Sequence, residues 1–373
     1  ALTSQSAGPK VAWLRDERPD VFAKAAMFHT CQSFLVARLT GEHVMDHTTA
    51  AYWGPFYDIH TNAWIDEWVT GTVEPKRLPR LVWPTEIVGR VTVEAASATG
   101  LAAGTPVIAG APDAPAEAVS AGVLGPGDLM IMYGSSIFMI AVVGETIVDP
   151  RMWAAPYVFE GTSIVAGGTS TAGTLTRWLI ELLSDEHDAA ALSEHYADFA
   201  AWATESPAGA NGLELLPYLS GERTPIHDPD ARGVIFGLSL RHTRADIARA
   251  ALEGIAQGIR RNAEVMLEMG VPIARIRAVG GGVRNRAWLQ AVSDCLGRPQ
   301  EVVTQRGAAY GDAILAALGV GALSHDAVPS WLEVDRSIEP DPALADLYAR
   351  QASRQRRLYE STKTLMHEVA RDA

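Results

Sequence analysis

The sequence predicts an α/β protein whose central sheet is at least partly parallel. From residue 244 onward, strand-like and helix-like segments alternate, which is typical of helices packed on a parallel sheet. The chain has 373 residues, more than a single hydrophobic core usually supports. Its composition, 48% hydrophobic and 20% charged, is ordinary for a folded globular protein. We therefore expect two domains built from strands and helices.

The opening of the chain predicts two helices. Residues 8–26 contain a proline near their start, where the missing N–H group costs nothing. Residues 29–41 end at Gly41, a residue type that commonly stops a helix. We expect one continuous helix in each of these two segments.

Residues 42–110 carry weaker patterns. Trp53, Trp64 and Trp68 lie among polar residues, where they either pack beneath loops or form a surface on which a sugar ring could stack. Residues 81–110 are rich in Val, Thr, Pro and Gly and end in "GTPVIAG", which predicts a short buried strand.

The middle of the chain predicts strands joined by glycine-containing turns. Residues 111–128 indicate the end of a strand, a helix and a Gly-Pro turn. Residues 129–143, "LMIMYGSSIFMIAVV", predict two strands around Gly134. Residues 163–183 predict a strand, a glycine loop and a helix.

The last part of the chain has the clearest periodicity. Residues 244–270 predict a helix, because apolar residues recur every fourth position and Gly270 provides a stop. The segments that follow are a strand at 275–279, a helix at 284–297, a strand at 299–305, a helix at 307–321 and a charged amphipathic helix after 341.

Charge and cysteine content exclude several classes of protein. A formal net charge of −13 argues against a nucleic-acid partner, because phosphate binding needs clustered Lys and Arg. The sequence contains no run of eighteen apolar residues, so it predicts no membrane-spanning helix. Cys31 and Cys295 lie far apart, which suits a reducing compartment, and we expect a cytoplasmic protein. No His or Cys spacing predicts a metal-ligand set.

Three consecutive glycines, Gly280–Gly282, stand between a predicted strand and a predicted helix. Ligands of open α/β sheets bind at the carboxyl ends of strands, where a bare backbone lets them approach closely. A tight turn without a ligand explains the glycines equally well. The chain contains neither a dinucleotide-binding glycine motif nor a P-loop.

Two further glycine loops strengthen the ligand interpretation. "YGSS", residues 133–136, could offer backbone N–H and side-chain O–H groups to phosphate oxygens, or could be a simple hairpin turn. Residues 166–178 place small and hydroxyl residues before a helix start, which is a natural site for an anion.

Asp113 is the carboxylate that attracts most interest. It follows a predicted strand among Ala, Gly and Pro, with no basic partner nearby in sequence. Either it caps the helix that follows, or it acts as a general base that accepts the proton of an attacking hydroxyl. The residues alone favour neither alternative.

Four segments together resemble the FGGY carbohydrate kinases, most closely their xylulokinase-like members. They are residues 110–136, 217–260, 279–299 and 307–319, and residues 8–52 are also similar to the middle of that family. The resemblance implies an actin-like ATPase fold (ribonuclease H-like), with duplicated domains around a cleft. It implies that residues 1–118 are the remainder of the N-terminal domain and residues 119–373 the C-terminal, nucleotide-binding domain.

The resemblance also implies an activity, ATP-dependent phosphorylation of a sugar hydroxyl with Mg²⁺. Asp113 matches the family's catalytic aspartate, which also contacts the substrate. The residues that match the nucleotide-binding turns are Gly134, Ser135, Ser136, Gly173, Gly281, Gly282 and Asn285. A pentulose such as D-xylulose is the expected substrate, with ribulose, gluconate or glycerol as alternatives. The expected partners are this small-molecule sugar and, as one option, a second copy of the chain.

One departure from the family pattern concerns the beginning of the first domain. Members of the family open with a strand, an Asp-x-Gly-Thr phosphate turn and a sugar-recognition segment, and the sequence contains none of these. We therefore expect an incomplete first domain. The chain is then either part of a longer enzyme or a degenerate homologue, such as a non-catalytic protein that binds nucleotides or sugars.

Overall fold

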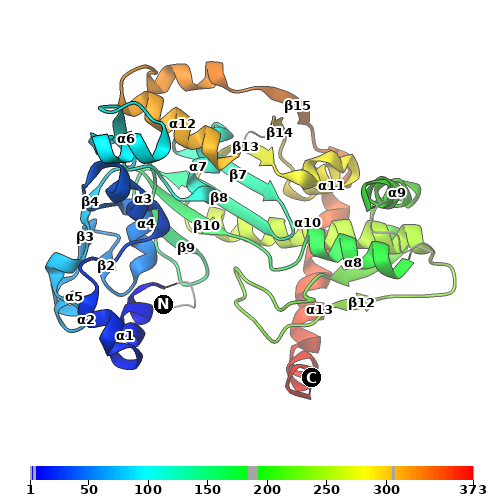
Figure 1. The fold of residues 1–373 in the computed structure, drawn as a ribbon. Helices are drawn as coiled ribbons and strands as arrows, with labels where there is room; N and C mark the ends of the chain where they lie inside the picture. The colour runs from blue at the N-terminus through cyan, green and yellow to red at the C-terminus, as the bar shows by residue number, and fades with distance from the viewer. Residues whose placement is uncertain (1, 3–5, 184–191, 305–306, 373) are drawn as a thin grey trace.

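A seven-stranded sheet forms the centre of the computed structural model, which describes residues 2, 6–183, 192–304 and 307–372 (Figure 1). The strand order is β15 (Val334–Ile338), β14 (Gln300–Val303), β13 (Ile273–Val279), β7 (Gly127–Tyr133), β8 (Ile137–Val143), β10 (Ser163–Gly167) and β9 (Trp153–Pro156). β14, β13 and β7 are parallel, and the remaining pairs are antiparallel. The expected α/β fold with a partly parallel sheet is confirmed.

Helices cover both faces of this sheet. One face packs against residues of α8 (Gly173–Leu183), α9 (Leu192–Glu205), α10 (Arg244–Glu268), α11 (Arg286–Leu296) and α13 (Ala345–Asp372). The other face packs against α7 (Asp113–Ser120) and α12 (Ala308–Gly319), which lie on the opposite side of the sheet in Figure 1. Side chains alternate along β7, with Ile131 and Tyr133 on the first face and Met130 on the second.

Residues 6–112 form a smaller structure beside the sheet. Its helices are α1 (Gly8–Glu17), α2 (Pro19–Lys24), α3 (Cys31–Thr40), α4 (His47–Ala50), α5 (Asp66–Thr70) and α6 (Val93–Thr99). Its strands form three two-stranded sheets: β1 (Val44–Asp46) with β4 (Arg80–Val82), β2 (Tyr57–Asp58) with β3 (Ala63–Trp64), and β5 (Ile87–Arg90) with β6 (Pro106–Ile108).

The prediction of one helix over residues 8–26 is wrong. The chain leaves the helical conformation at Arg18 (φ −134°, ψ 56°), so that α1 and α2 are separate. The following Pro19 explains the break, because a residue before proline is pushed away from the helical region. The second helix is confirmed, since α3 ends at Gly41 in a left-handed conformation (φ 82°). The predicted buried strand at 104–110 is β6, which is only half-buried.

The packing interpretation holds for two of the three tryptophans. Trp53 is 3% exposed and meets Trp64 edge to face at a centroid distance of 6.0 Å. Trp68 is 54% exposed. Trp53 thus belongs to a small hydrophobic core that also includes Val11, Phe28 and Phe56, and Trp64 packs against this core.

The remaining predicted elements are confirmed with small shifts of their ends. The strands around Gly134 are β7 and β8, and the strand, loop and helix at 163–183 are β10 and α8. The end of the predicted strand 299–305 lies outside the described residues. No helix in the described ranges is long and apolar enough to cross a membrane.

Candidate active site

Two of the glycine turns lie next to each other at one edge of the sheet. β7 and β13 are parallel, and Met132 pairs with Val279 at their carboxyl ends. The "YGSS" turn therefore leaves the sheet beside the triple glycine. This is the edge at which open parallel sheets bind ligands.

The three consecutive glycines have different surroundings. Gly280 has φ +99°, and a Cβ there would lie 2.6 Å from the carbonyl oxygen of Tyr133. A Cβ at Gly282 would lie 2.7 Å from the Trp288 ring. Gly281 is exposed, and nothing lies within 4 Å of its Cβ position. Gly280 and Gly282 are therefore needed by the packing of the protein, and Gly281 is the one whose backbone faces open space.

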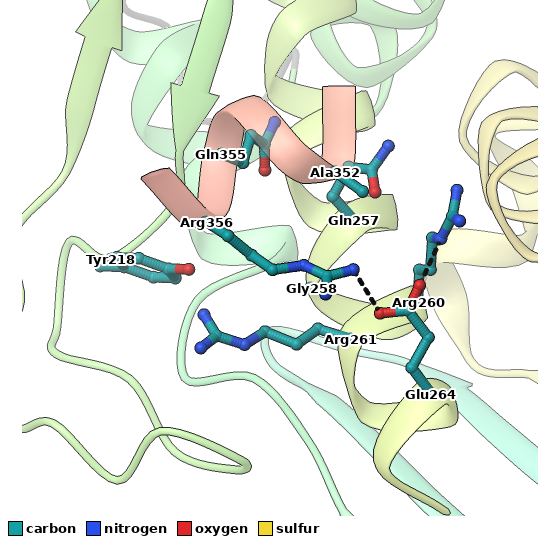
Figure 2. A pocket seen from close by; sticks show the side chains of 9 residues that line it. All are labelled: Tyr218, Gln257, Gly258, Arg260, Arg261, Glu264, Ala352, Gln355 and Arg356. Carbon is teal, nitrogen blue, oxygen red and sulfur yellow. Dashed lines mark hydrogen bonds and ion pairs between the residues drawn. The ribbon is translucent and has the colours of Figure 1, made fainter. Parts of the chain in front are cut away.

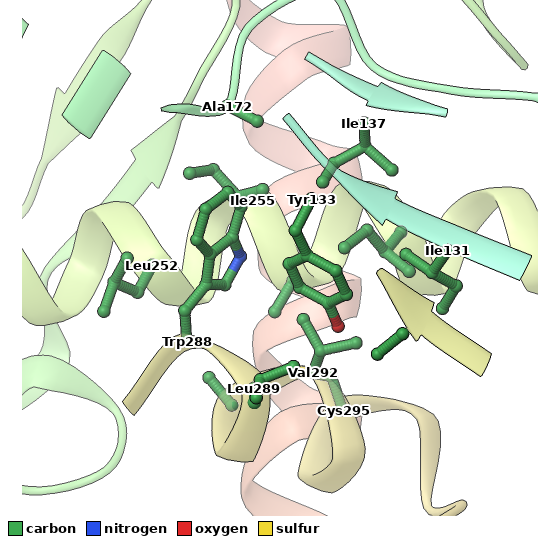
Figure 3. Packing of buried hydrophobic residues seen from close by; sticks show 14 of the residues in the cluster. Ile131, Tyr133, Ile137, Ala172, Leu252, Ile255, Trp288, Leu289, Val292 and Cys295 are labelled. Carbon is green, nitrogen blue, oxygen red and sulfur yellow. The ribbon is translucent and has the colours of Figure 1, made fainter. Parts of the chain in front are cut away.

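Tyr133 lies against the triple glycine, since a Cβ at Gly282 would lie 2.9 Å from the Cβ of Tyr133. It is fully buried and meets Trp288 in a T-shaped contact, with ring centroids 5.1 Å apart. Its hydroxyl donates a hydrogen bond to Gln300 Oε1. Figure 3 shows Tyr133 and Trp288 enclosed by aliphatic side chains that include Leu252 and Ile255. The glycine edge is therefore supported by a dense apolar core.

The third glycine loop is joined to the "YGSS" turn by backbone hydrogen bonds. The N–H of Gly173 donates to the Gly134 carbonyl (3.1 Å), and those of Ala172 and Thr174 donate to the Ser135 carbonyl (3.0 and 3.1 Å). A Cβ at Gly173 would lie 2.6 Å from the Gly134 oxygen. These N–H groups at the start of α8 are therefore already satisfied. An anion at this helix start, which the sequence suggested, would find them occupied.

Hydroxyl groups remain available beside these turns. Ser135 is exposed and Ser136 half-buried, and within the described ranges neither hydroxyl makes a hydrogen bond. Thr169 and Thr171, in the loop before α8, are buried, and their hydroxyl oxygens have no partner among the described residues. A buried hydroxyl without a partner is unfavourable, so these groups are ready to bond to a ligand or to water.

Asn285 has a local structural role. It is the N-cap of α11, where its Oδ1 accepts a hydrogen bond from the Trp288 N–H (3.1 Å). The cap fixes the direction in which α11 leaves the triple glycine. Asn285 is half-buried.

Asp113 is the first residue of α7 and is exposed. Pro112 occupies the N-cap position, and the Asp113 carboxylate accepts a hydrogen bond only from the N–H of Ala114 (2.8 Å) in the described structure. Asp113 is therefore not the N-cap of α7, and helix capping does not account for an aspartate at this position. No hydrogen bond joins Asp113 to the glycine turns among the described residues.

The start of α7 is held against α12. The Asp312 carboxylate accepts a hydrogen bond from the Ala111 N–H (3.2 Å), and burial raises the pKa of Asp312. A Cβ at Gly311 would lie 1.8 Å from the Ala116 carbonyl oxygen, so the two helices touch through backbone. α12 follows β14, whose carboxyl end lies on the same side as those of β7 and β13. Asp113 thus begins a helix that is fixed on the sheet.

Three residues near Asp113 were not predicted from the sequence. Asp46 is 1% exposed and caps α4, and burial raises its pKa to about 6. Gln32 donates to Asp46 Oδ2 (3.2 Å) and to the Ala109 carbonyl (2.7 Å), which ties α3 to the segment before Asp113. Burial raises the pKa of Tyr52, and the charges of Asp113 and Asp46 add to this effect. Of these three residues, only Asp46 could have been found in the sequence. An aspartate is a common helix N-cap, and Asp46 Oδ1 accepts a hydrogen bond from the N–H of Thr49, three residues later.

Comparison with known proteins identifies the family. Residues 1–120 match the N-terminal domain of the FGGY family of carbohydrate kinases, and residues 129–320 match its C-terminal domain. The chain belongs to the FGGY family of carbohydrate kinases. The resemblance seen in the sequence is therefore confirmed, and with it the assignment to sugar kinases of actin-like fold.

The relatives cover almost the whole chain. The crystal structure of a xylulose kinase from Rhodospirillum rubrum matches with a TM-score of 0.91 and 34% identity, covering 98% of this chain and 74% of that protein. A xylulose kinase of Escherichia coli (strain K12) is 30% identical over 96% of this chain and 73% of its own length. A glycerol kinase of Nitratidesulfovibrio vulgaris (strain DP4) is 31% identical over 91% and 69%. The chain is thus similar to kinases of more than one polyol or sugar.

Proposed function

We propose that the chain transfers the terminal phosphoryl group of ATP to a hydroxyl of a pentulose, with D-xylulose as the first candidate. The observation that carries this proposal is the sheet edge at which an exposed glycine backbone lies beside serine hydroxyls that have no partner among the described residues. The similarity to xylulose kinases supports the choice of sugar, and the similarity to a glycerol kinase makes glycerol the alternative.

Gly281 and the "YGSS" turn would hold the nucleotide. The open side of Gly281 suits the approach of adenosine to the main chain, where a side chain would stand in the way. The hydroxyls of Ser135 and Ser136, which make no hydrogen bond to other described residues, would donate to phosphate oxygens. Gly173, Gly282 and Asn285 support these groups through the contacts that hold the turns in place.

Asp113 would accept the proton of the attacking hydroxyl. A bond forms between the sugar oxygen and the terminal phosphorus while the bond from phosphorus to the ADP oxygen breaks, and the hydroxyl proton passes to the carboxylate. Phosphoryl transfer depends mainly on positioning and charge stabilisation, so a fixed carboxylate and well-placed donors supply much of what the chain must contribute. The exposure of Asp113 leaves its carboxylate accessible to a sugar.

Magnesium would bind at this site together with the nucleotide. Among the described residues, no group of three His, Cys, Asp or Glu side chains could hold a metal ion. Mg²⁺ usually keeps several waters and binds through substrate phosphates, so it would enter together with the nucleotide. There it would neutralise charge on the phosphates. The division at residue 118, a cytoplasmic location and a homodimer remain predictions.

The test is ADP formation from MgATP in the presence of a panel of pentuloses, hexoses, gluconate and glycerol. ADP release that depends on D-xylulose, and that is lost in Asp113→Asn, is the expected result. ADP release that depends on glycerol alone would mean that the reaction is as proposed but that glycerol is its substrate. If no sugar stimulates ADP release while MgADP binds, the chain acts as a binding protein and the catalytic proposal is wrong.

A further inference from the structure

Glu222 is a buried carboxylate that holds the loop before α8. It is 6% exposed and lies in the connection between β11 (Glu214–Leu216) and β12 (Val234–Phe236). Its Oε1 accepts hydrogen bonds from the N–H groups of Ser170 and Arg223, both at 2.7 Å. Ser170 belongs to the loop that connects β10 to α8. The carboxylate thus joins two segments that lie 52 residues apart in the chain.

A second side chain of the same connection binds this loop two residues earlier. Thr224 is 1% exposed, and its hydroxyl accepts a hydrogen bond from the Gly168 N–H (2.6 Å) and donates one to Asn262 Oδ1 (2.6 Å). A Cβ at Gly168 would lie 2.1 Å from the carbonyl oxygen of Ile137, the first residue of β8. The loop is therefore bound by residues 222–224 and packs against the strand that follows the "YGSS" turn.

The same loop is bonded to the "YGSS" turn itself. The N–H groups of residues 172–174 donate to the carbonyl oxygens of Gly134 and Ser135, and the Thr174 hydroxyl donates to the Ser135 carbonyl (3.0 Å). Because Ser170 lies two residues before the first of these donors, a shift of Ser170 would move the donors and the turn that they hold.

Two arginines offset part of the cost of burying Glu222. Burial raises the pKa of Glu222 to about 7. The N–H groups of Arg223 and Ser170 oppose this rise, and so do the charges of Arg223 and Arg261. Figure 2 shows Arg261 extending from α10 toward Tyr218, which belongs to the same connection as Glu222. A buried carboxylate is unfavourable unless it is paired or hydrogen-bonded, and these groups supply both hydrogen bonds and positive charge.

We propose that Glu222 is a positioning residue of the nucleotide site, which acts on the "YGSS" turn through the loop at 168–174. This role rests on the function proposed above, because that function places nucleotide phosphates at Ser135 and Ser136. Glu222 fixes the loop, the loop fixes the turn, and the turn presents the two hydroxyls. A misplacement of about 1 Å, caused by a change far from the chemistry, can cost roughly 100-fold in rate.

Two substitutions separate the hydrogen-bond acceptor from the rest of the side chain. Glu222→Met removes the acceptor and is expected to weaken MgADP binding by roughly tenfold or more, measured by calorimetry. Glu222→Gln keeps an oxygen that can accept from Ser170 and should restore most of the affinity. In steady-state kinetics, the KM for ATP should rise in Glu222→Met while the KM for the sugar stays near that of the parent chain.

Glu214→Met is the matched control for Glu222→Met. Glu214 is likewise a buried carboxylate, 2% exposed, but its side-chain partners are Arg354 and Gln355 of α13. We expect Glu214→Met to lower stability in urea unfolding while MgADP affinity stays near that of the parent. The control therefore separates a general loss of stability from a displaced nucleotide site.

Thr224→Val replaces Glu222→Met if that variant does not fold. It removes the hydroxyl that accepts from Gly168 and should also weaken MgADP binding. Equal MgADP affinity in the parent and the folded variant, or an equal loss of affinity in Glu214→Met, would overturn the positioning role. If Gly281→Leu still weakens MgADP binding in that case, the nucleotide site stands without Glu222. Absence of MgADP binding by the parent chain would overturn both proposals.

Discussion

The part of the chain before Asp113 and the sheet after it differ in how they are held together. Strands in residues 6–112 have two to four residues and pair in twos, whereas β7, β8 and β13 have seven residues each within one seven-stranded sheet. Two-stranded sheets are marginal by themselves and depend on packing against other elements. The sheet is buried on both faces by two large hydrophobic clusters.

This difference suggests that the two regions contribute different steps of the proposed reaction. The glycine turns rest on the sheet, where Tyr133 and Trp288 fix their positions within a dense core. Asp113 stands where the smaller part meets the sheet, at the start of α7 and against α12. We therefore expect nucleotide binding to depend on the sheet edge and proton transfer to depend on the junction.

The largest effect is expected at the junction, from Asp113→Asn. Turnover should fall by roughly 10²–10⁴-fold, because the base is lost, while MgADP affinity stays near that of the parent. The free energy of unfolding should change by less than about 1 kcal/mol, because the substitution removes only the interaction of an exposed carboxylate with the helix dipole. Steady-state kinetics and calorimetry measure both quantities.

Asp66→Asn is the matched control for this substitution. Asp66 is likewise an exposed aspartate at the first position of a helix, α5. Its replacement should leave turnover unchanged. Equal losses of turnover in the two variants, or full turnover in Asp113→Asn, would show that Asp113 is not the general base.

A loss of stability is also expected from Gly311→Ala, which acts on the contact between α12 and α7, the helix that Asp113 begins. The new Cβ would lie 1.8 Å from the Ala116 carbonyl oxygen, so α7 and α12 must separate. Overpacking of this kind typically costs about 1–3 kcal/mol, and urea unfolding measures it. Gly125→Ala is the control, because nothing lies within 4 Å of its Cβ position. Equal stability of the two variants would show that the helices are not in backbone contact.

A third effect concerns the smaller part and its buried carboxylate, Asp46. Burial raises its pKa from 3.8 to about 6, so between these pH values the folded state binds a proton that the unfolded state has lost. Stability should therefore fall as pH rises from about 4 to about 6 and then stay level, with a total contribution of about 3 kcal/mol. In Asp46→Asn this part of the decline should disappear.

Urea unfolding at pH 4, 5, 6 and 7 makes the comparison between parent and Asp46→Asn. Glu222, whose pKa burial raises to about 7, contributes a decline of the same sign in both proteins, so only the difference between them reports Asp46. Parallel stability curves for the two proteins would show that Asp46 is not protonated in the folded state.

The smallest effect should come from the open glycine. Gly281→Leu is expected to weaken MgADP binding about tenfold, equivalent to 1.4 kcal/mol, without loss of stability. Gly282→Leu should instead destabilise the fold, because its Cβ position is filled by Trp288 and Tyr133. Calorimetry and urea unfolding of both variants test the distinction. Unchanged ADP affinity in a folded Gly281→Leu protein would mean that the glycines form only a turn.

Local patterns in the sequence predicted the sheet elements and the turns well. The alternation in β7 and the four-residue spacing in α10 reflect burial, which a sequence shows directly. The break at Arg18 depended on a single proline that the helical pattern concealed. The end of α3 at Gly41 was easier, because a glycine there adopts the left-handed conformation.

What each glycine does could not be predicted, because it depends on contacts distant in sequence. Gly282 meets Tyr133, and Gly173 meets Gly134, across gaps that no local pattern records. The neighbours of Asp113 were missed for the same reason. Asp46 and Gln32 reach the segment before Asp113 only when α3 and β6 come together in the fold.

Hydrogen exchange of the chain with and without MgADP would show whether the sheet edge holds the nucleotide. We expect slower amide exchange at residues 134–136 and 280–285, with no change over residues 31–70, because the nucleotide is held by the sheet edge alone. Protection confined to residues 31–70, or none at the two glycine turns under saturating MgADP, would contradict it.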